Sequence, residues 1–239
     1  QEYQTRPLVL QITRMISASI LFLIEFIREI LIGGLKTVVA FTSWDWITAN
    51  PWAELPGIPW TIVTAGAVIL GYKLNGKGLA TFAGITMIYI SVFGQWEPSM
   101  ETLSFVLVAA PISFILGLVL GIWAYKSKRV ETALNPLLNV MQTMPHYAYL
   151  VPIMVMFGIG DHAGAIATII FATPPMVRLT LLALRGVSPE VIEAGKMSGC
   201  SDFQLLFKVL IPTARRDILI GVNQVIMQCL AMAVIASFI

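Results

Sequence analysis

Residues 188–212 of this 239-residue chain read SPEVIEAGKMSGCSDFQLLFKVLIP. Ser188 is a favourable N-cap residue, and the proline after it suits the first position of a helix. Gly199 suits the left-handed backbone conformation that closes a helix. Ser201, with a glutamine three residues later, has the pattern of a capping box that starts a second helix. The segment therefore predicts two short helices joined at a glycine, and we call residues 188–212 the knob.

The chain around the knob is too apolar for a soluble domain. Hydrophobic residues make up 57% of the sequence, charged residues make up 12%, and the mean hydropathy is +0.83. An ordinary soluble domain carries roughly a quarter charged residues. The net charge of +2 provides no basic surface for a nucleic acid. The composition excludes soluble, disordered and nucleic-acid-binding proteins, and it indicates an integral membrane protein.

Apolar runs between clusters of charge predict the membrane-spanning helices. About six are expected, over residues 60–75, 79–96, 102–125, 136–158, 163–185 and 214–239. The sequence stops inside the last apolar run, so we expect a further C-terminal span to be missing after Ile239. The predicted fold is an all-α polytopic membrane protein whose transmembrane domain covers residues 59–239.

The charged residues beside these spans separate by sign. Basic residues gather on one side, at Lys73, Lys77, Lys126, Lys128, Arg129, Arg185, Lys196, Lys208, Arg215 and Arg216. The loops on the opposite side carry only acidic charge, at Asp45, Glu54, Glu97, Glu101 and Asp161. Because basic loops stay in the cytoplasm, the knob is predicted to be cytoplasmic.

Residues 1–58 are predicted to lie along the outer membrane interface. At about 100° per residue, one narrow sector of a helix collects Gln11, Arg14, Glu25, Arg28, Glu29, Lys36 and Ser43. Such a charged stripe is costly at mid-bilayer, whereas an amphipathic helix is stable in the interface. A true span whose stripe faces other helices is the alternative. The next stretch predicts an interfacial aromatic belt, with Trp44, Trp46, Trp52 and Trp60 among prolines.

The knob resembles the cytoplasmic signature loop of ABC importer permeases. That loop has the pattern Glu-Ala-Ala, three residues, Gly, nine residues, then Ile-x-Leu-Pro. The matching positions here are Glu193, Ala194, Gly195, Gly199, Val209, Leu210, Ile211 and Pro212. Gly195 replaces the second alanine, which lowers the propensity of the first short helix. Val209 and Ile211 are conservative apolar departures.

The resemblance extends well beyond the knob. Three segments look like the glycine betaine/proline betaine branch of these permeases: MQTMPHYAYLVPIMVMFGIG at 141–160, TIIFATPPMVRLTLLALRGV at 168–187 and GVNQVIM at 221–227. Residues from about 102 to 239 match well, and the similarity is weaker from residue 60 onward. The resemblance implies a type I ABC importer fold in the bacterial cytoplasmic (inner) membrane.

The same resemblance implies the partners and the role of the chain. A second permease copy, two ATPase subunits and an external binding protein are the expected partners, with ATP and magnesium held by the ATPases. The chain itself contains no GxxxxGK[ST] run, so no enzyme activity and no bound cofactor are expected of it. The resemblance also assigns a set of ATPase-coupling residues, namely Glu190, Glu193, Ala194, Gly195, Gly199, Leu205, Phe207 and Pro212.

The implied solute is glycine betaine or proline betaine. Choline, carnitine, trimethylamine N-oxide and an amino acid are alternatives, because the binding protein selects the solute in this family. A secondary carrier is a more remote alternative. It predicts coupling carboxylates at membrane depth, and the spans within residues 79–239 have no Asp or Glu at their centres.

Amide and hydroxyl side chains within the apolar runs are candidates for the translocation path. They are Gln142, Thr143, Asn223, Gln224 and Gln228. Polar groups at membrane depth usually face other helices or water, and hydrogen bonding between helices is the alternative role. Pro145, Pro152, Pro174 and Pro175 are either bending points of a gate or static kinks. The distant His146 and His162 predict no metal site, and Cys200 and Cys229 are expected to be packing residues.

Overall fold

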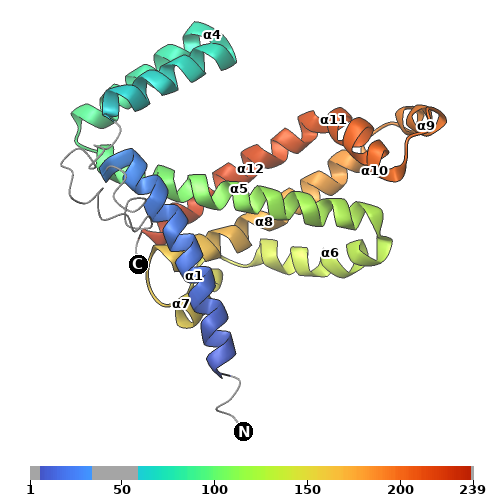
Figure 1. Cartoon of the computed structure of the whole chain (residues 1–239), viewed down its shortest axis with the longest axis horizontal. Helices are drawn as coiled ribbons and strands as arrows, with labels where there is room; N and C mark the ends of the chain where they lie inside the picture. The colour runs from blue at the N-terminus through green and yellow to red at the C-terminus, as the bar shows by residue number, and fades with distance from the viewer. Residues whose placement is uncertain (1–5, 34–58, 238–239) are drawn as a thin grey trace, which may run out of the picture. The chain divides into compact units, whose positions relative to one another are not determined.

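The computed structural model describes residues 6–33 and 59–237, and every regular element within these ranges is helical (Figure 1). The chain divides into two compact units. One is Ala18–Leu107, and the other combines Gln1–Ser17 with Val108–Ile239. The predicted aromatic belt at Trp44, Trp46 and Trp52 lies outside the described residues.

The N-terminal helix α1 (Arg6–Arg28) continues into a short π-helical segment, η1 (Glu29–Gly33). Ile24 and Thr13 are buried, whereas Glu25 and Arg28 are exposed together with apolar residues such as Met15. Arg28 Nε lies 3.8 Å from Glu101 Oε1. The predicted helix is present, and its location at the membrane interface stays a prediction.

Helix α4 (Trp60–Val92) is a hairpin that contains the predicted span 60–75 and most of the predicted span 79–96 (Figure 1). The helical geometry is interrupted at Asn75 and Gly76, and Gly76 has a φ of +74°. The two arms approach closely beside this turn. A Cβ atom at Gly71 would lie 3.1 Å from the carbonyl oxygen of Leu79.

Three helices in the described ranges are long and apolar enough to cross a membrane: α5 (Trp96–Lys126), α8 (Asp161–Arg185) and α12 (Arg215–Ala236). They confirm helices over the predicted spans 102–125, 163–185 and 214–239. The innermost is α8, and α12 runs along it (Figure 1). These contacts place the core of the second unit around α8.

Glycines allow the backbones of these helices to approach closely. A Cβ atom at Gly117 on α5 would lie 2.4 Å from Met176 Cβ on α8, and one at Gly121 would lie 2.6 Å from Thr180 Cβ. On α12, a Cβ atom at Gly221 would lie 2.7 Å from Met176 Sδ. Gly117 and Gly121 are four residues apart, as in the small-residue packing motifs of membrane helices.

The predicted span 136–158 is wrong, because two separate helices occupy this region. They are α6 (Lys128–Thr143) and α7 (Tyr147–Phe157), and Met144 between them has an extended backbone with φ −73° and ψ 136°. Pro145 explains the break, since the residue before a proline is disfavoured in the α conformation. Pro152, Pro174 and Pro175, in contrast, lie within continuous helices.

Candidate functional site

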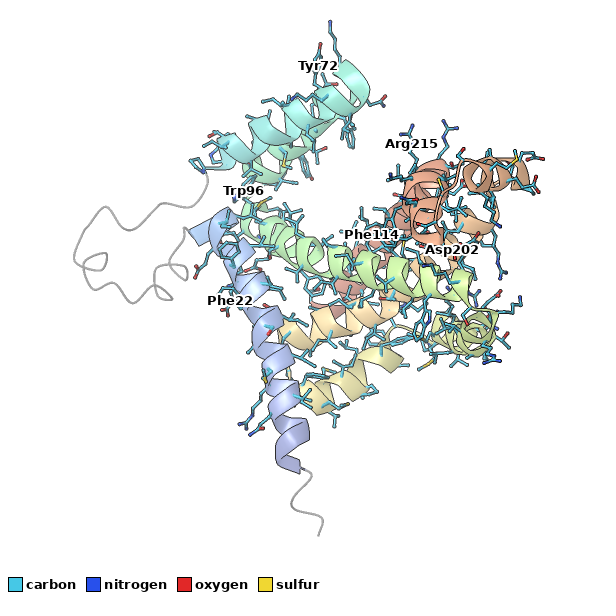
Figure 2. The ribbon with its side chains drawn as sticks, turned by 45° about the vertical axis from the view of Figure 1, so that its right-hand side comes forward. Phe22, Tyr72, Trp96, Phe114, Asp202 and Arg215 are labelled. Atoms are coloured by element: carbon cyan, nitrogen blue, oxygen red, sulfur yellow. The ribbon has the colours of Figure 1, made fainter. Side chains whose placement is uncertain are left out.

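The knob has the predicted local structure. Its first helix is α9 (Pro189–Met197), and Gly199 follows it with a φ of +78°. The chain then continues through α10 (Asp202–Gln204), η2 (Leu205–Leu210) and α11 (Ile211–Thr213). Figure 2 labels Asp202 at the start of this second half and Arg215 at the start of α12, which follows it.

The capping box at the start of α10 is present. The backbone N–H of Ser201 donates to Gln204 Oε1 at 3.0 Å, and the backbone N–H of Gln204 donates to Ser201 Oγ at 3.4 Å. The helical path continues through Pro212 to Thr213. The π-helical segment η2 ends two residues before Pro212, which has no backbone N–H to donate within a helix.

Gly195 has a packing role that the sequence did not indicate. It is buried in α9, where an added Cβ atom would lie 2.7 Å from Leu205 Cδ1 and 3.3 Å from Val209 Cγ2. Both neighbours belong to η2. The departure from alanine at this position therefore lets α9 lie directly against η2, which makes the knob a packed unit.

Replacing Gly195 tests this packing. Gly195→Val should destabilise the protein by about 1–3 kcal/mol, since overpacking displaces Leu205 and Val209. Gly195→Ala should have a smaller effect, because the closest atom is the end of a flexible leucine side chain. Melting temperatures of the detergent-solubilised protein measure both changes. Ala194→Val is the matched control on the exposed side of the same helix, and an equal loss of stability there would contradict the packing role.

The outer surface of the knob is apolar and aromatic. Met197 is 85% exposed, Phe203 65% and Phe207 49%, and the centroids of the two phenylalanine rings lie 4.5 Å apart. We call Phe203 and Phe207 the aromatic pair. Leu205, which the resemblance assigns to coupling, is buried, and so is its neighbour Leu206. Exposed apolar clusters of this kind are typical of sites that contact another protein or a membrane.

The other residues assigned to coupling lie around this surface. Glu190, Glu193, Ala194, Gly199 and Pro212 are exposed, whereas Gly195 is buried with Leu205. Hydrogen bonds from its own backbone N–H and from Ser188 hold the pKa of Glu190 below its ordinary value. The surface therefore carries a carboxylate at the start of α9 under neutral conditions. The coupling role of these residues stays a prediction.

Phe203 is the member of this surface that the sequence analysis missed. It lies in the first turn of α10, between the capping-box residues Ser201 and Gln204. Its spacing of four residues from Phe207 is the signal that identifies it, because residues four apart share one face of a helix.

The candidate path residues lie on two separate helices. Gln142 and Thr143 are exposed at the end of α6, and the Thr143 hydroxyl donates to the carbonyl of Val140 at 3.0 Å. On α12, Asn223 and Gln224 are exposed and Gln228 is half-buried. The buried face of α12 holds Gly221, Val225, Cys229 and Met232 instead. These amides point away from the packed core, and their role in a path stays a prediction.

Both histidines have local partners. The His146 ring lies 4.2 Å from the Phe171 ring, and His162 Nε2 lies 2.8 Å from the carbonyl oxygen of Phe157. Within the described ranges, no group of three or more His, Cys, Asp or Glu side chains could hold a metal ion. The structure thus gives both histidines packing and hydrogen-bonding roles.

Residues 113–239 match the family described as "Binding-protein-dependent transport system inner membrane component". The match begins within α5 and includes the whole knob. The chain is also 71% identical over 239 residues to a trimethylamine N-oxide transport system permease protein of Pelagibacter ubique, covering 100% of this chain and 33% of the relative.

Two further relatives show the same relationship. The protein of that name from Ruegeria pomeroyi is 46% identical over 213 residues, which cover 89% of this chain and 32% of the relative. A glycine betaine/proline betaine transport system permease protein of Escherichia coli is 42% identical over 185 residues, or 77% of this chain and 52% of the relative. The chain thus spans between a third and half of the length of these relatives.

Proposed function

Because this chain belongs to the quaternary-amine branch of the binding-protein-dependent inner membrane transport components, we propose that it is the permease core of an ABC importer for trimethylamine N-oxide. It is a non-catalytic component of the inner membrane. The identity of 71% along the whole chain to a trimethylamine N-oxide permease carries the choice of solute.

This choice corrects the order of solutes in the sequence analysis, where glycine betaine came first and trimethylamine N-oxide was an alternative. The relative that carries the name glycine betaine/proline betaine is 42% identical. That similarity keeps glycine betaine as the second candidate. Both solutes present a trimethylated nitrogen to the transporter, and they differ in whether an oxide oxygen or a carboxymethyl group balances its charge.

The proposed mechanism converts closure of two ATPase subunits into movement of the membrane helices. The aromatic pair and Glu193 contact the ATPases, which hold ATP and magnesium, while an external binding protein delivers the solute. The knob follows α8 and precedes α12, and these two helices pack together at Met176 and Gly221. A packed knob attached to both helices moves them together when an ATPase pulls on it.

The finer architecture belongs to the same proposal. We assign the type I importer fold, with the permease acting as a pair of membrane subunits. About six crossings then arise from α4, α5, α8 and α12 together with the segment around the break before α7. The candidate path residues Gln142, Thr143, Asn223, Gln224 and Gln228 face the solute path between the subunits, because amide and hydroxyl groups that are not buried in the packed core would be unfavourable in contact with lipid.

Uptake into proteoliposomes tests this function. The full-length permease, its ATPase and its binding protein are reconstituted, and labelled trimethylamine N-oxide is supplied outside with ATP or ADP inside. We expect uptake with ATP only. Unlabelled trimethylamine N-oxide should compete at concentrations at least about tenfold lower than glycine betaine, choline, carnitine or proline, a difference of ~1.4 kcal/mol.

The competition separates the candidates. Stronger inhibition by glycine betaine would restore it as the principal solute and overturn the choice made from the relatives. Uptake that proceeds equally with ADP would contradict an ATP-driven importer and favour a secondary carrier.

A further inference from the structure

Two polar links connect α6 to α8, side by side in the second unit (Figure 1). Arg178 donates to Asn139 Oδ1, and Arg185 donates to Glu131 Oε2. Along α8 the two arginines are separated by two helical turns, and their partners on α6 occur in the reverse order. The links therefore hold the two antiparallel helices together at two levels.

The link at Glu131 is the stronger of the two. The Glu131 side chain is 7% exposed and also lies 3.0 Å from Lys128 Nζ. Its hydrogen bonds with Arg185 and Lys128 hold its pKa below the ordinary value. A buried carboxylate that loses its partner is strongly unfavourable, so separation of α6 from α8 at this level is costly.

The position of this link connects two functional segments. Arg185 is the last residue of α8, directly before the turn that leads to Ser188 and the knob. Glu131 lies near the start of α6, and the far end of α6 leads to the break at Met144. Across that break, the Tyr149 hydroxyl of α7 donates to the carbonyl of Met141 on α6. Helix α6 thus connects the start of the knob, next to Arg185, with the break at Met144.

We propose that Glu131 and Arg185 are positioning residues that keep α6 fixed to α8 during transport, so that movement of the knob reaches the break at residues 144–146. This inference rests on the proposed function, because it concerns how that importer couples ATP hydrolysis to transport. With the link in place, α6 and α8 move as one body. Without the link, the knob moves α8, but α6 and the break at residues 144–146 do not follow that movement.

Substitution of Arg185 provides the first test in the reconstituted importer. Arg185→Gln should preserve ATP hydrolysis but lower the number of solute molecules transported per ATP by about tenfold, the factor expected when a buried polar partner is removed. Arg185→Lys keeps the charge and should restore most of the ratio. Arg129→Gln is the matched control, because it removes a positive charge from an exposed position on α6.

The outcomes separate this inference from the proposed function. If the unmodified importer shows no ATP-dependent uptake, the proposed function itself is contradicted. An unmodified importer that transports, together with an unchanged ratio in Arg185→Gln, would overturn only the positioning role.

A cross-link provides a second test that does not depend on the folding of Arg185→Gln. Cysteines replace Glu131 and Arg185 after Cys200→Ser and Cys229→Ala have removed the native thiols, and a short bismaleimide joins them. We expect the linked importer to transport more solute per ATP than the same cysteine variant with both thiols capped by N-ethylmaleimide, because the cross-link replaces the lost contact between α6 and α8. Arrest of uptake only in the linked protein would show that α6 and α8 must separate, and would overturn the proposal.

Discussion

Gly117→Ala is expected to destabilise the protein by about 3 kcal/mol, at the upper end of the usual cost of overpacking. The added Cβ atom would lie 2.4 Å from Met176 Cβ and 3.2 Å from the carbonyl oxygen of Thr173. Neither atom can move away by a side-chain rotation alone, so α5 and α8 must separate. A fall of about 6–12 °C in the melting temperature of the purified permease is the expected result.

Two matched substitutions control for the loss of glycine itself. Gly66→Ala on α4 adds a Cβ atom with nothing within 4 Å, and it should stabilise the helix by roughly 0.5–1 kcal/mol. Gly221→Ala should have an intermediate effect, because its nearest neighbour is the movable Sδ atom of Met176. If Gly117→Ala were as stable as Gly66→Ala, the close packing of α5 on α8 would be contradicted.

The double substitution Phe203→Asp and Phe207→Asp should abolish coupling to the ATPases. Exposed aromatic residues that become buried in an interface typically contribute about 2–4 kcal/mol each to binding. Carboxylates at both positions would weaken ATPase binding by at least about a hundredfold, which corresponds to ~2.8 kcal/mol. Co-purification of the ATPase and ATP-dependent uptake of trimethylamine N-oxide should both be lost.

The control for this experiment preserves the apolar surface. Phe203→Leu with Phe207→Leu should retain ATPase binding and most of the uptake, while the melting temperature of the isolated permease should stay near that of the unmodified protein in both double variants. Normal ATPase binding by the aspartate variant would exclude the aromatic pair from the interface.

The knob was predictable in detail because its structure is determined locally. Gly199, Ser201 and Gln204 each satisfy or terminate a helix through atoms a few residues away, and the structure has each of these features. Ser188 stands at the predicted N-cap position, but its side chain makes no capping hydrogen bond. Hydrophobic periodicity does not distinguish the inner from the outer side of such short helices. The buried Leu205 is therefore among the residues expected at the ATPase contact, whereas the exposed Phe203 is not.

The break between α6 and α7 shows where apolar runs are insufficient. Residues 136–158 are apolar enough to suggest one span, but Pro145 has the stronger local effect because it disfavours the α conformation at Met144. Pro145 is visible in the sequence, but within an apolar run it suggests a bend in one helix as readily as a break between two.

The contacts between helices could not be predicted from the sequence. Gly117 and Met176 are far apart in the chain, as are Glu131 and Arg185. A glycine within an apolar run has several possible explanations, and a charged residue at the end of a helix is common. Only the packing of the second unit shows that these residues meet.

The hairpin α4 has a consequence for the lipid around it. Each arm is about 24 Å long at 1.5 Å per residue, whereas the hydrocarbon core of a bilayer is about 30 Å thick. The arms end near Lys73 and Lys77, which flank the turn at Asn75 and Gly76 and are exposed. Lysine side chains can snorkel, with their apolar stems in the hydrocarbon and their ammonium groups among the phosphates. In the membrane crossing proposed for α4, the two lysines would therefore offset much of the hydrophobic mismatch that so short a hairpin imposes on the bilayer.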